Sequence, residues 1–223
     1  KYMLLKYLFK MIFIIPIKKN SKRLKNKNFL ILKKKPLFKW TTDFAKKFFN
    51  KENILISTDC EKTANLLKQN DFQVPFLRPK YLSRQSSSMF SVIYHAINTY
   101  EKKFNKNIKY LTLLQPTSPY RSISDLKDGL KLFYKNYKPT MSVTKLHVKS
   151  ESIYLKENNF IKKLNYKKKI SYIPNGSFYI LKKEQLFKNK SFYFKEMNYV
   201  EIKEHQKRVD IDYMEDFKLA SKI

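Results

Sequence analysis

Leu113–Arg121 reads L-L-Q-P-T-S-P-Y-R and continues an apolar run, Tyr110–Leu114, that the hydrophobic pattern predicts to be a buried strand. Pro116 and Pro119 cannot extend this strand, and they stiffen the turn that follows it. Polar side chains are concentrated in the same turn: Gln115, Thr117, Ser118 and Arg121. Because ligands of open α/β sheets bind where strands end at their carboxyl edge, this turn predicts a binding edge for a polar, anionic ligand.

Apolar runs expected to be strands alternate with amphipathic segments along most of the chain. The expected strands lie at 12–17, 54–57, 110–114, 140–144 and 177–181, with a further extended segment at 72–77. The expected helices cover 37–49, about 61–68, a segment capped by Ser87 or Ser88 and running to Tyr100, a segment from Ser124 to Phe133, and 213–220. This alternation predicts an α/β fold with a mostly parallel sheet sandwiched by helices. Between 145 and 173 the pattern changes to a hairpin, with strands near 153–155 and 160–164 around a turn at 157–159.

Five further motifs stand at the expected strand ends. They are K-K-N-S-K-R-L-K-N-K-N at 18–28, I-L-I-S-T-D at 54–59, V-P-F-L-R-P at 74–79, N-G-S-F-Y-I at 175–180 and V-D-I-D-Y at 209–213. In order and spacing, these motifs and 113–121 resemble the acylneuraminate cytidylyltransferases (CMP-sialic acid synthetases), from about Ile12 to Ala220. The resemblance implies a Rossmann-like fold of the nucleotide-diphospho-sugar transferase type. It also implies a catalytic domain at 11–223 and a dimerisation or lid insertion at about 145–173, with residues 1–10 as an N-terminal extension.

The resemblance implies cytidylyl transfer from CTP to an acidic nine-carbon sugar, of the sialic or legionaminic type, with release of pyrophosphate. The sugar's anomeric hydroxyl would attack, so no protein nucleophile is required. The residues carried over for the nucleotide are Lys18, Asn20, Ser21, Lys22, Lys27, Asn28, Arg78, Ser86 and Ser88. Two positions depart from the family pattern: Lys18 replaces an arginine and loses its two-pronged geometry, and Gln85 stands near the place of an acid. An alternative role for Arg78 is a helix cap or an ion pair with Asp71.

Asp210 and Asp212 are the expected metal ligands. In a strand, residues two apart point to the same side, so both carboxylates would project together while Val209 and Ile211 pack inward. Carboxylate oxygens suit Mg²⁺, and the resemblance implies that the pair holds Mg²⁺ against the triphosphate, with Lys22 as a catalytic cation. The alternative is that the two acids pair with surrounding lysines.

The resemblance places the sugar beside Gln115, and Thr117, Ser118 and Arg121 are further sugar-binding candidates that shape the adjoining turn. Phe178 and Tyr179 would flank the sugar, after a tight turn at Asn175–Gly176. Asp59 is expected to cap the helix that follows it rather than to face the nucleotide ribose. The remaining candidates, His95, His147, His205 and Cys60, have no spacing typical of metal ligands or nucleophiles and are interpreted as structural.

The formal net charge is +30 over 223 residues, yet the lysines are spread from Lys6 to Lys222. This spread indicates a solvated surface rather than a specific nucleic-acid face, although salt-sensitive binding to polyanions is expected. The single cysteine excludes an internal disulfide and favours the cytoplasm, and no apolar run approaches the roughly 20 residues of a membrane span. A homodimer follows from the resemblance. Three alternatives stay open: the same chemistry on 3-deoxy-octulosonate or pseudaminic acid, a polyanion-binding protein, and a degenerate homologue with little turnover.

Overall fold

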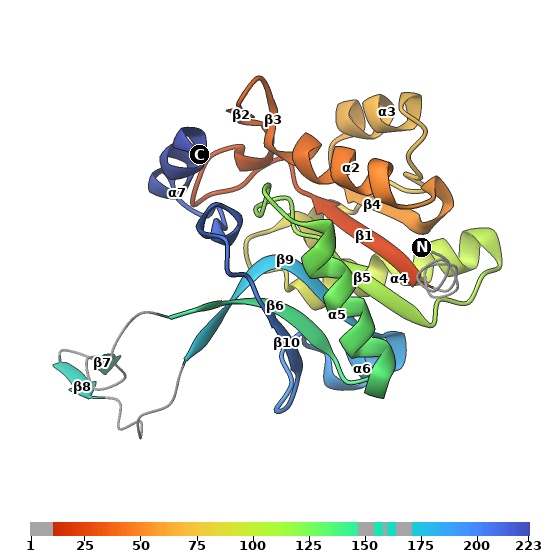
Figure 1. Cartoon of the computed structure of the whole chain (residues 1–223). Coiled ribbons are helices and arrows are strands. Elements are labelled where there is room, and N and C mark those ends of the chain that lie inside the picture. The colour runs from red at the N-terminus through yellow and green to blue at the C-terminus, as the bar shows by residue number, and fades with distance from the viewer. Residues whose placement is uncertain (1–10, 147–153, 158–159, 164–170) are drawn as a thin grey trace.

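The computed structural model describes residues 11–146, 154–157, 160–163 and 171–223, and a mixed sheet runs through its centre (Figure 1). The strand order is β10-β6-β9-β5-β1-β4. The strands are β1 (Met11–Ile17), β4 (Ile54–Thr58), β5 (Tyr110–Leu113), β6 (Thr140–Lys145), β9 (Tyr172–Lys182) and β10 (Asn198–Glu201). The pairs β1–β4, β1–β5 and β6–β10 are parallel, whereas β9 is antiparallel to both β5 and β6. The predicted mostly parallel α/β sheet is therefore confirmed, with β9 as its antiparallel member.

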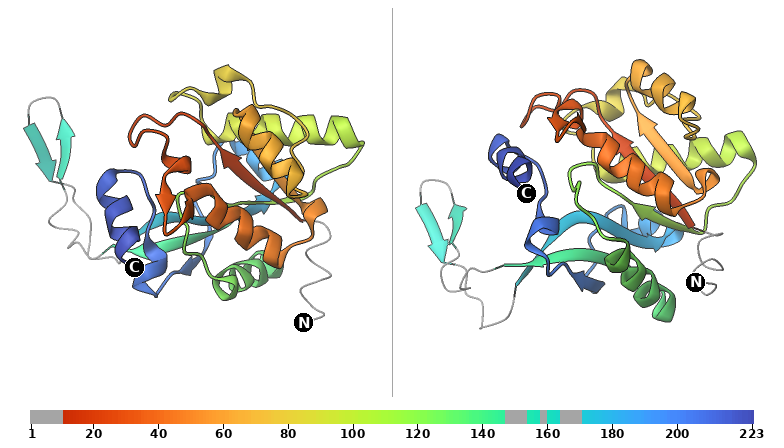
Figure 2. Two further views of the ribbon diagram at one scale, coloured as in Figure 1. Left: turned by 90° about the horizontal axis from the view of Figure 1, so that it is seen from above. Right: turned by 45° about the horizontal axis from the view of Figure 1, so that its top comes forward.

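Helices cover both faces of the sheet, as the two core clusters and Figure 2 show. One layer contains α2 (Leu37–Phe48), α3 (Glu61–Gln69) and α5 (Ile123–Asn136). The opposite layer contains α4 (Met89–Phe104) and α6 (Lys183–Asn189). The last helix, α7 (Met214–Lys222), contacts the small hairpin of β2 (Ile31–Leu32) and β3 (Lys35–Pro36). Short 3-10 helices complete the connections: η1 (Lys27–Phe29), η2 (Lys51–Asn53), η3 (Lys80–Ser83) and η5 (His205–Arg208).

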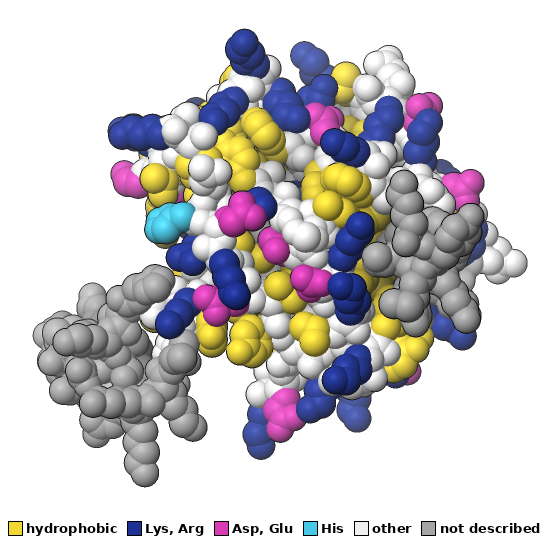
Figure 3. Space-filling view, viewed as in Figure 1, with side chains coloured by type: hydrophobic (Ala, Val, Ile, Leu, Met, Phe, Trp, Pro, Cys, Tyr) yellow, Lys and Arg dark blue, Asp and Glu magenta, His cyan; other side chains and the backbone are white. Residues whose placement is uncertain are grey.

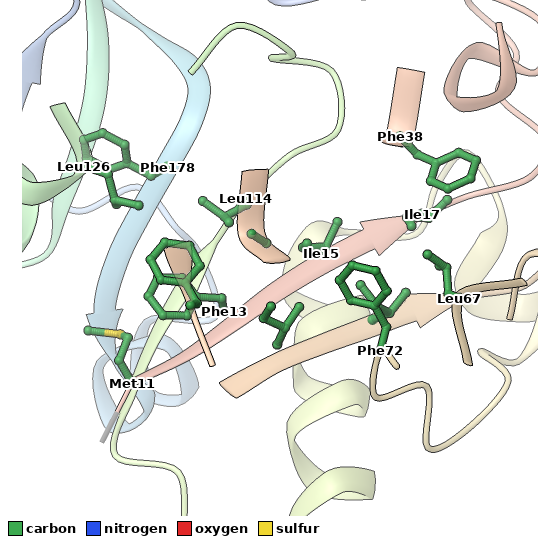
Figure 4. Packing of buried hydrophobic residues seen from close by; sticks show 14 of the residues in the cluster. Met11, Phe13, Ile15, Ile17, Phe38, Leu67, Phe72, Leu114, Leu126 and Phe178 are labelled. Atoms are coloured by element: carbon green, nitrogen blue, oxygen red, sulfur yellow. The ribbon is translucent and has the colours of Figure 1, made fainter. Parts of the chain in front are cut away.

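Strand β1 contributes side chains to both layers of the core. Phe13 and Ile15 pack with α2, α3 and α5, whereas Ile12 and Ile14 pack with α4. Figure 4 shows the first of these clusters, in which the Phe13 ring lies along β1. Every residue of β1 is buried, as is typical of a parallel strand covered on both faces.

Gly129 allows α5 to pack closely on β9. A Cβ atom at this position would lie 2.6 Å from Cε2 and 2.9 Å from Cζ of Phe178. The Phe178 ring is fully buried among the side chains of the first cluster (Figure 4), so it has little space to move. The glycine therefore sets the distance between this helix and the sheet.

Several expected elements differ in the structure. Val209–Tyr213 is not a strand, although its alternating burial was foreseen, and Phe72–Leu77 makes only isolated bridges, from Gln73 and Leu77. Asn175–Gly176 is not an entry turn, because it lies inside β9 where the register with β6 shifts. The sequence patterns did not indicate β10 or α6. The predicted cap of α4 is confirmed, since the Ser88 hydroxyl accepts a hydrogen bond from Ser91 N at 3.0 Å.

The expected hairpin in the insertion is present as the antiparallel pair β7 (Tyr154–Glu157) and β8 (Phe160–Lys163). Both strands lie apart from the main sheet in all three ribbon views (Figures 1 and 2). Ile153, the turn at 158–159 and Leu164 fall outside the described residues, as do the expected extension at 1–10 and His147.

Basic side chains are distributed over the face seen in Figure 3 rather than gathered into one patch. This distribution agrees with a solvated lysine surface. Within the described residues, no helix combines the length and apolar character needed to cross a membrane.

Candidate functional site

A cavity of about 460 Å³ opens beside the carboxyl ends of β1 and β5. Pro16 and Lys18 reach it from the end of β1, and Gln115, Pro116 and Thr117 reach it from the turn after β5. Proline has no backbone N–H, but its place in β1 leaves no bond unmade. Pairing between β1 and β5 ends at Ile14 and Leu113, with one further bond from Leu114 N to Ile14 O, so β5 offers no carbonyl opposite Pro16. The cavity therefore lies where the sequence placed the binding edge.

Many of the predicted site residues line this cavity. They are Lys18, Ser21, Lys22, Lys27, Asn28, Arg78, Gln115, Thr117, Tyr179, Asp210 and Asp212. These residues come from five separated segments of the chain, which the sheet brings together. Cations occupy the loop at 18–28 and position 78, and two carboxylates stand on the C-terminal segment. The result is a polar cavity with a predominance of positive charge.

The basic loop at 18–28 is held by its own polar side chains. Ser21 Oγ donates to Leu24 O at 2.5 Å and accepts from Lys27 N at 2.8 Å, and Asn28 Nδ2 donates to Lys18 O at 2.8 Å. Lys18 Nζ donates to Arg84 O at 3.0 Å, and partial burial together with the nearby Arg78 lowers the pKa of Lys18. Ser21 and Asn28 thus shape the loop, while the lysines supply its charge.

Arg78 is a buried cation whose side chain is held by groups from β1 and η3. Its Nη2 donates to Ile17 O at 3.2 Å and its Nε donates to Ser83 Oγ at 3.1 Å. Its Nη2 also lies 3.6 Å from Asp59 Oδ1. Burial lowers the pKa of Arg78, and Asp59 opposes this effect. The suggested ion pair with Asp71 is wrong, because that acid bonds a lysine on the surface.

The expected helix cap at Asp59 is also wrong. Its Oδ1 accepts a hydrogen bond from Lys19 N at 2.7 Å and lies near Arg78, so the carboxylate faces the basic loop. Helix α3 instead begins after Cys60, which makes no side-chain cap. Asp59 therefore links β4 to the cavity wall.

Asp210 and Asp212 both face the cavity, although the segment is not a strand. Side chains still alternate between the core and the cavity along this segment, because Val209 and Ile211 are buried in the small core cluster beside α7. The backbone is also held by a hydrogen bond from Ile211 N to Thr117 O at 2.8 Å. The two carboxylates have different surroundings. Burial raises the pKa of Asp210, against a hydrogen bond with Thr117, whereas Asp212 is ion-paired.

Asp212 binds two cations of the basic loop. Lys27 Nζ lies 2.7 Å from Asp212 Oδ1, and Arg23 Nη1 lies 2.7 Å from Asp212 Oδ2. The alternative that these acids pair with basic residues is thus realised at Asp212. Arg23 was not among the predicted site residues, and its only signal was its place in the K-R-L segment of the basic loop.

The residues present fit a divalent cation. Asp210 Oδ1 is buried and has no hydrogen-bond partner among the described residues. At Gly176, whose φ is +74°, a Cβ would lie 2.6 Å from Gln115 Oε1 and 3.4 Å from Asp210 Oδ1, so these oxygens border one small space. No group of three or more His, Cys, Asp or Glu able to hold a metal occurs in the part of the chain that the structure describes. An ion here would need phosphate and water oxygens as well, as Mg²⁺ commonly does.

Six predicted residues lie outside the cavity lining. Asn20 and Ser86 are exposed, and Ser88 caps α4 and borders a smaller cavity of about 160 Å³ that shares Gln115 with the main one. Three are corrected because they are buried and face inward: Ser118 donates to Asn175 O at 2.7 Å, Arg121 bonds the backbone beneath the turn, and Phe178 packs in the core. The pattern could not show which side of the turn or strand faces the ligand.

Comparison with known proteins agrees with this geometry. The family model described as Cytidylyltransferase matches residues 12–223. The chain belongs to the cytidylyltransferase family. It is 32% identical to the N-acylneuraminate cytidylyltransferase of Escherichia coli O18:K1:H7 over 95% of this chain and 51% of that protein. It is 27% identical to the CMP-N,N'-diacetyllegionaminic acid synthase of Legionella pneumophila, over 94% of each. The chain thus spans about half the length of the first relative and nearly all of the second.

Solved structures show the same fold. CMP:2-keto-3-deoxy-manno-octonic acid synthetase, solved with CTP, superposes with a TM-score of 0.66 at 11% identity over 96% of this cytidylyltransferase-family chain and 97% of that structure. The 4-diphosphocytidyl-2C-methyl-D-erythritol synthase of Anaerococcus prevotii gives a TM-score of 0.60 at 9% identity over 95% and 97% of the two chains. These likenesses support the expected Rossmann-like architecture.

Proposed function

We propose that this protein transfers a cytidylyl group from CTP to an acidic nine-carbon sugar of the sialic or legionaminic type and releases pyrophosphate. The observation that carries the proposal is the shared cavity, in which the cations of 18–28 and Arg78 face Asp210 and Asp212. The family match and the names of the two relatives support the choice of CTP and of a nonulosonic acid. A cavity with excess positive charge suits two anionic substrates.

The triphosphate is assigned to the basic loop. CTP carries about four negative charges, which fixed cations offset more effectively than water because they need no reorganisation. Lys18, Lys22 and Lys27 line the cavity from this loop. Lys22 is exposed, so its side chain is free to move toward the phosphates. Arg78 is the candidate for the cytosine, whose ring nitrogen and carbonyl accept hydrogen bonds. Its bonds to Ile17 and Ser83 hold the guanidinium in one orientation.

Asp210 and Asp212 would hold Mg²⁺, and the ion would neutralise charge on the triphosphate when bound. The partnerless oxygen of Asp210 supports this assignment. Gln115, Thr117 and Tyr179 border the space left for the sugar acid. The smaller cavity extends that space, and its walls include the aromatic residues Phe192 and Tyr193. Such walls suit an acylated sugar better than an unsubstituted one.

The reaction forms one phosphorus–oxygen bond and breaks another. The anomeric oxygen bonds to the α-phosphorus, the bond from that phosphorus to the bridging oxygen of the β-phosphate breaks, and the hydroxyl proton passes to solvent. The residues of the cavity hold the two substrates in line and offset the developing charge. The assembly proposed for the protein is a homodimer, and the separate position of β7–β8 supports a role for this hairpin in the contact.

Pyrophosphate release tests the proposed function. The chain is assayed with CTP and Mg²⁺ against N-acetylneuraminic acid, N,N'-diacetyllegionaminic acid, pseudaminic acid and 3-deoxy-octulosonate. We expect the highest kcat/KM with one of the first two acids, and loss of most activity in Asp210→Ala. Release that is absent with every acid would refute the proposal, and a preference for either of the last two would reassign the substrate.

A further inference from the structure

Arg23 and Asp212 form an ion pair at the mouth of the cavity that the cytidylyl-transfer scheme leaves without a role. Arg23 Nη1 lies 2.7 Å from Asp212 Oδ2, and its guanidinium stands over the Tyr213 ring at 5.7 Å from the ring centroid. The other carboxylate oxygen bonds Lys27 Nζ at 2.7 Å. Both oxygens of Asp212 are therefore occupied by cations of the basic loop.

The two cations are not equally held. The Lys27 side chain is 10% exposed and its backbone N–H is bonded to Ser21 Oγ, whereas the Arg23 side chain is 53% exposed. An exposed ion pair contributes little stability, so Arg23 can leave Asp212 at small cost. A divalent ion that used both aspartates would have to displace a cation from Asp212 first, and Arg23 is the partner that can move.

Once released, Arg23 remains beside the place assigned to the triphosphate. It lines the same cavity as its sequence neighbour Lys22 and as Lys18. A guanidinium presents a planar fork of donors that matches two phosphate oxygens, and it bonds phosphate as readily as carboxylate. When a triphosphate arrives with its metal ion, the metal can bind the Asp212 carboxylate and the phosphate can bind the Arg23 guanidinium.

We propose that Arg23 is a further nucleotide-binding residue, which the free protein holds on Asp212 and which transfers to the phosphates when metal and nucleotide arrive together. This inference rests on the proposed function, because it assumes that CTP occupies the cavity. Its consequence is that the free protein binds a divalent cation weakly, since of the two aspartates Asp210 alone offers it an unoccupied carboxylate oxygen.

The test measures Mn²⁺ binding by electron paramagnetic resonance without nucleotide, in wild type, Arg23→Gln and Lys22→Gln. Both variants remove one positive charge from the same loop, but only Arg23 is bonded to Asp212. An exposed pair is worth up to about 1 kcal/mol, which corresponds to about a fivefold change in affinity. We expect Arg23→Gln to bind Mn²⁺ several-fold more tightly than wild type, and more tightly than Lys22→Gln.

A second measurement follows CTP in the presence of Mg²⁺ by calorimetry. We expect Arg23→Gln to weaken CTP binding about tenfold and Arg23→Lys to weaken it less. Because the side chain is exposed, we expect either change to shift the midpoint of thermal unfolding by no more than about 4 °C. Equal Mn²⁺ affinity in the two glutamine variants, or unchanged CTP affinity in Arg23→Gln, would overturn the inference. If wild type itself neither binds CTP nor releases pyrophosphate, the proposed function fails instead.

Discussion

Arg121 is a buried cation whose hydrogen bonds join three parts of the fold beneath the cavity. Its Nη1 donates to Thr41 Oγ1 in α2 at 2.6 Å, its Nη2 to Gln115 O at 2.6 Å, and its Nε to Ser177 O in β9 at 3.2 Å. Burial lowers the pKa of Arg121 to about 9, and Asp210 opposes the effect, so the side chain stays charged at neutral pH. The residue holds the turn after β5 in place instead of binding the sugar.

Replacing Arg121 with methionine tests this structural role. The change removes the hydrogen bonds that Arg121 donates to three buried or partly buried oxygens, although Gln115 O keeps its bond from Ser118 N. Each buried oxygen left without a donor costs about 1–3 kcal/mol. We expect the free energy of unfolding of Arg121→Met to fall by about 3 kcal/mol or more in denaturant titrations. Arg84→Met, at an exposed cavity residue, is the control and should change it by less than about 0.5 kcal/mol. An Arg121 variant as stable as wild type would contradict this structural role.

At the scale of elements, the site depends on how helices and strands meet beneath it. Helix α5 lies against β9 through Gly129 and Phe178, and β9 carries Gly176 next to Gln115 and Asp210. The register shift between β6 and β9 places this irregular part of the strand beside the cavity. Packing at the α5–β9 contact therefore supports the floor of the site.

A Gly129→Ala substitution tests the contact between α5 and β9. Alanine favours a helix by about 1 kcal/mol over glycine, but overpacking of a filled core costs about 1–3 kcal/mol. Because the new Cβ would stand 2.6 Å from the Phe178 ring, we expect net destabilisation of up to about 2 kcal/mol. The measurement is chemical unfolding, with Lys127→Ala on the exposed face of α5 as the control. Greater stability in Gly129→Ala would show that the ring can move aside.

At the scale of the whole molecule, the α/β architecture could be predicted because strand periodicity and proline-ended turns are local signals. The basic loop and Gln115 follow the ends of β1 and β5, whereas the roles of Arg78 and the two aspartates were implied by the family resemblance of their motifs. Contacts between distant segments could not be found in this way. The pair of Arg23 and Asp212 joins residues far apart in the chain, and the side of the turn that Arg121 faces depends on packing by α2 and β9. The edge strand β10 was not predicted, because its four residues, Asn198–Glu201, are too few to give a clear hydrophobic pattern.

The most direct measurement is a crystal structure of the protein soaked with CTP and Mn²⁺, with anomalous scattering used to locate the metal. We expect a manganese peak within coordination distance of Asp210 Oδ1, with the triphosphate along residues 18–28 and the cytosine beside Arg78. A nucleotide bound away from this cavity, or a metal with no aspartate ligand, would contradict cytidylyl transfer at this site.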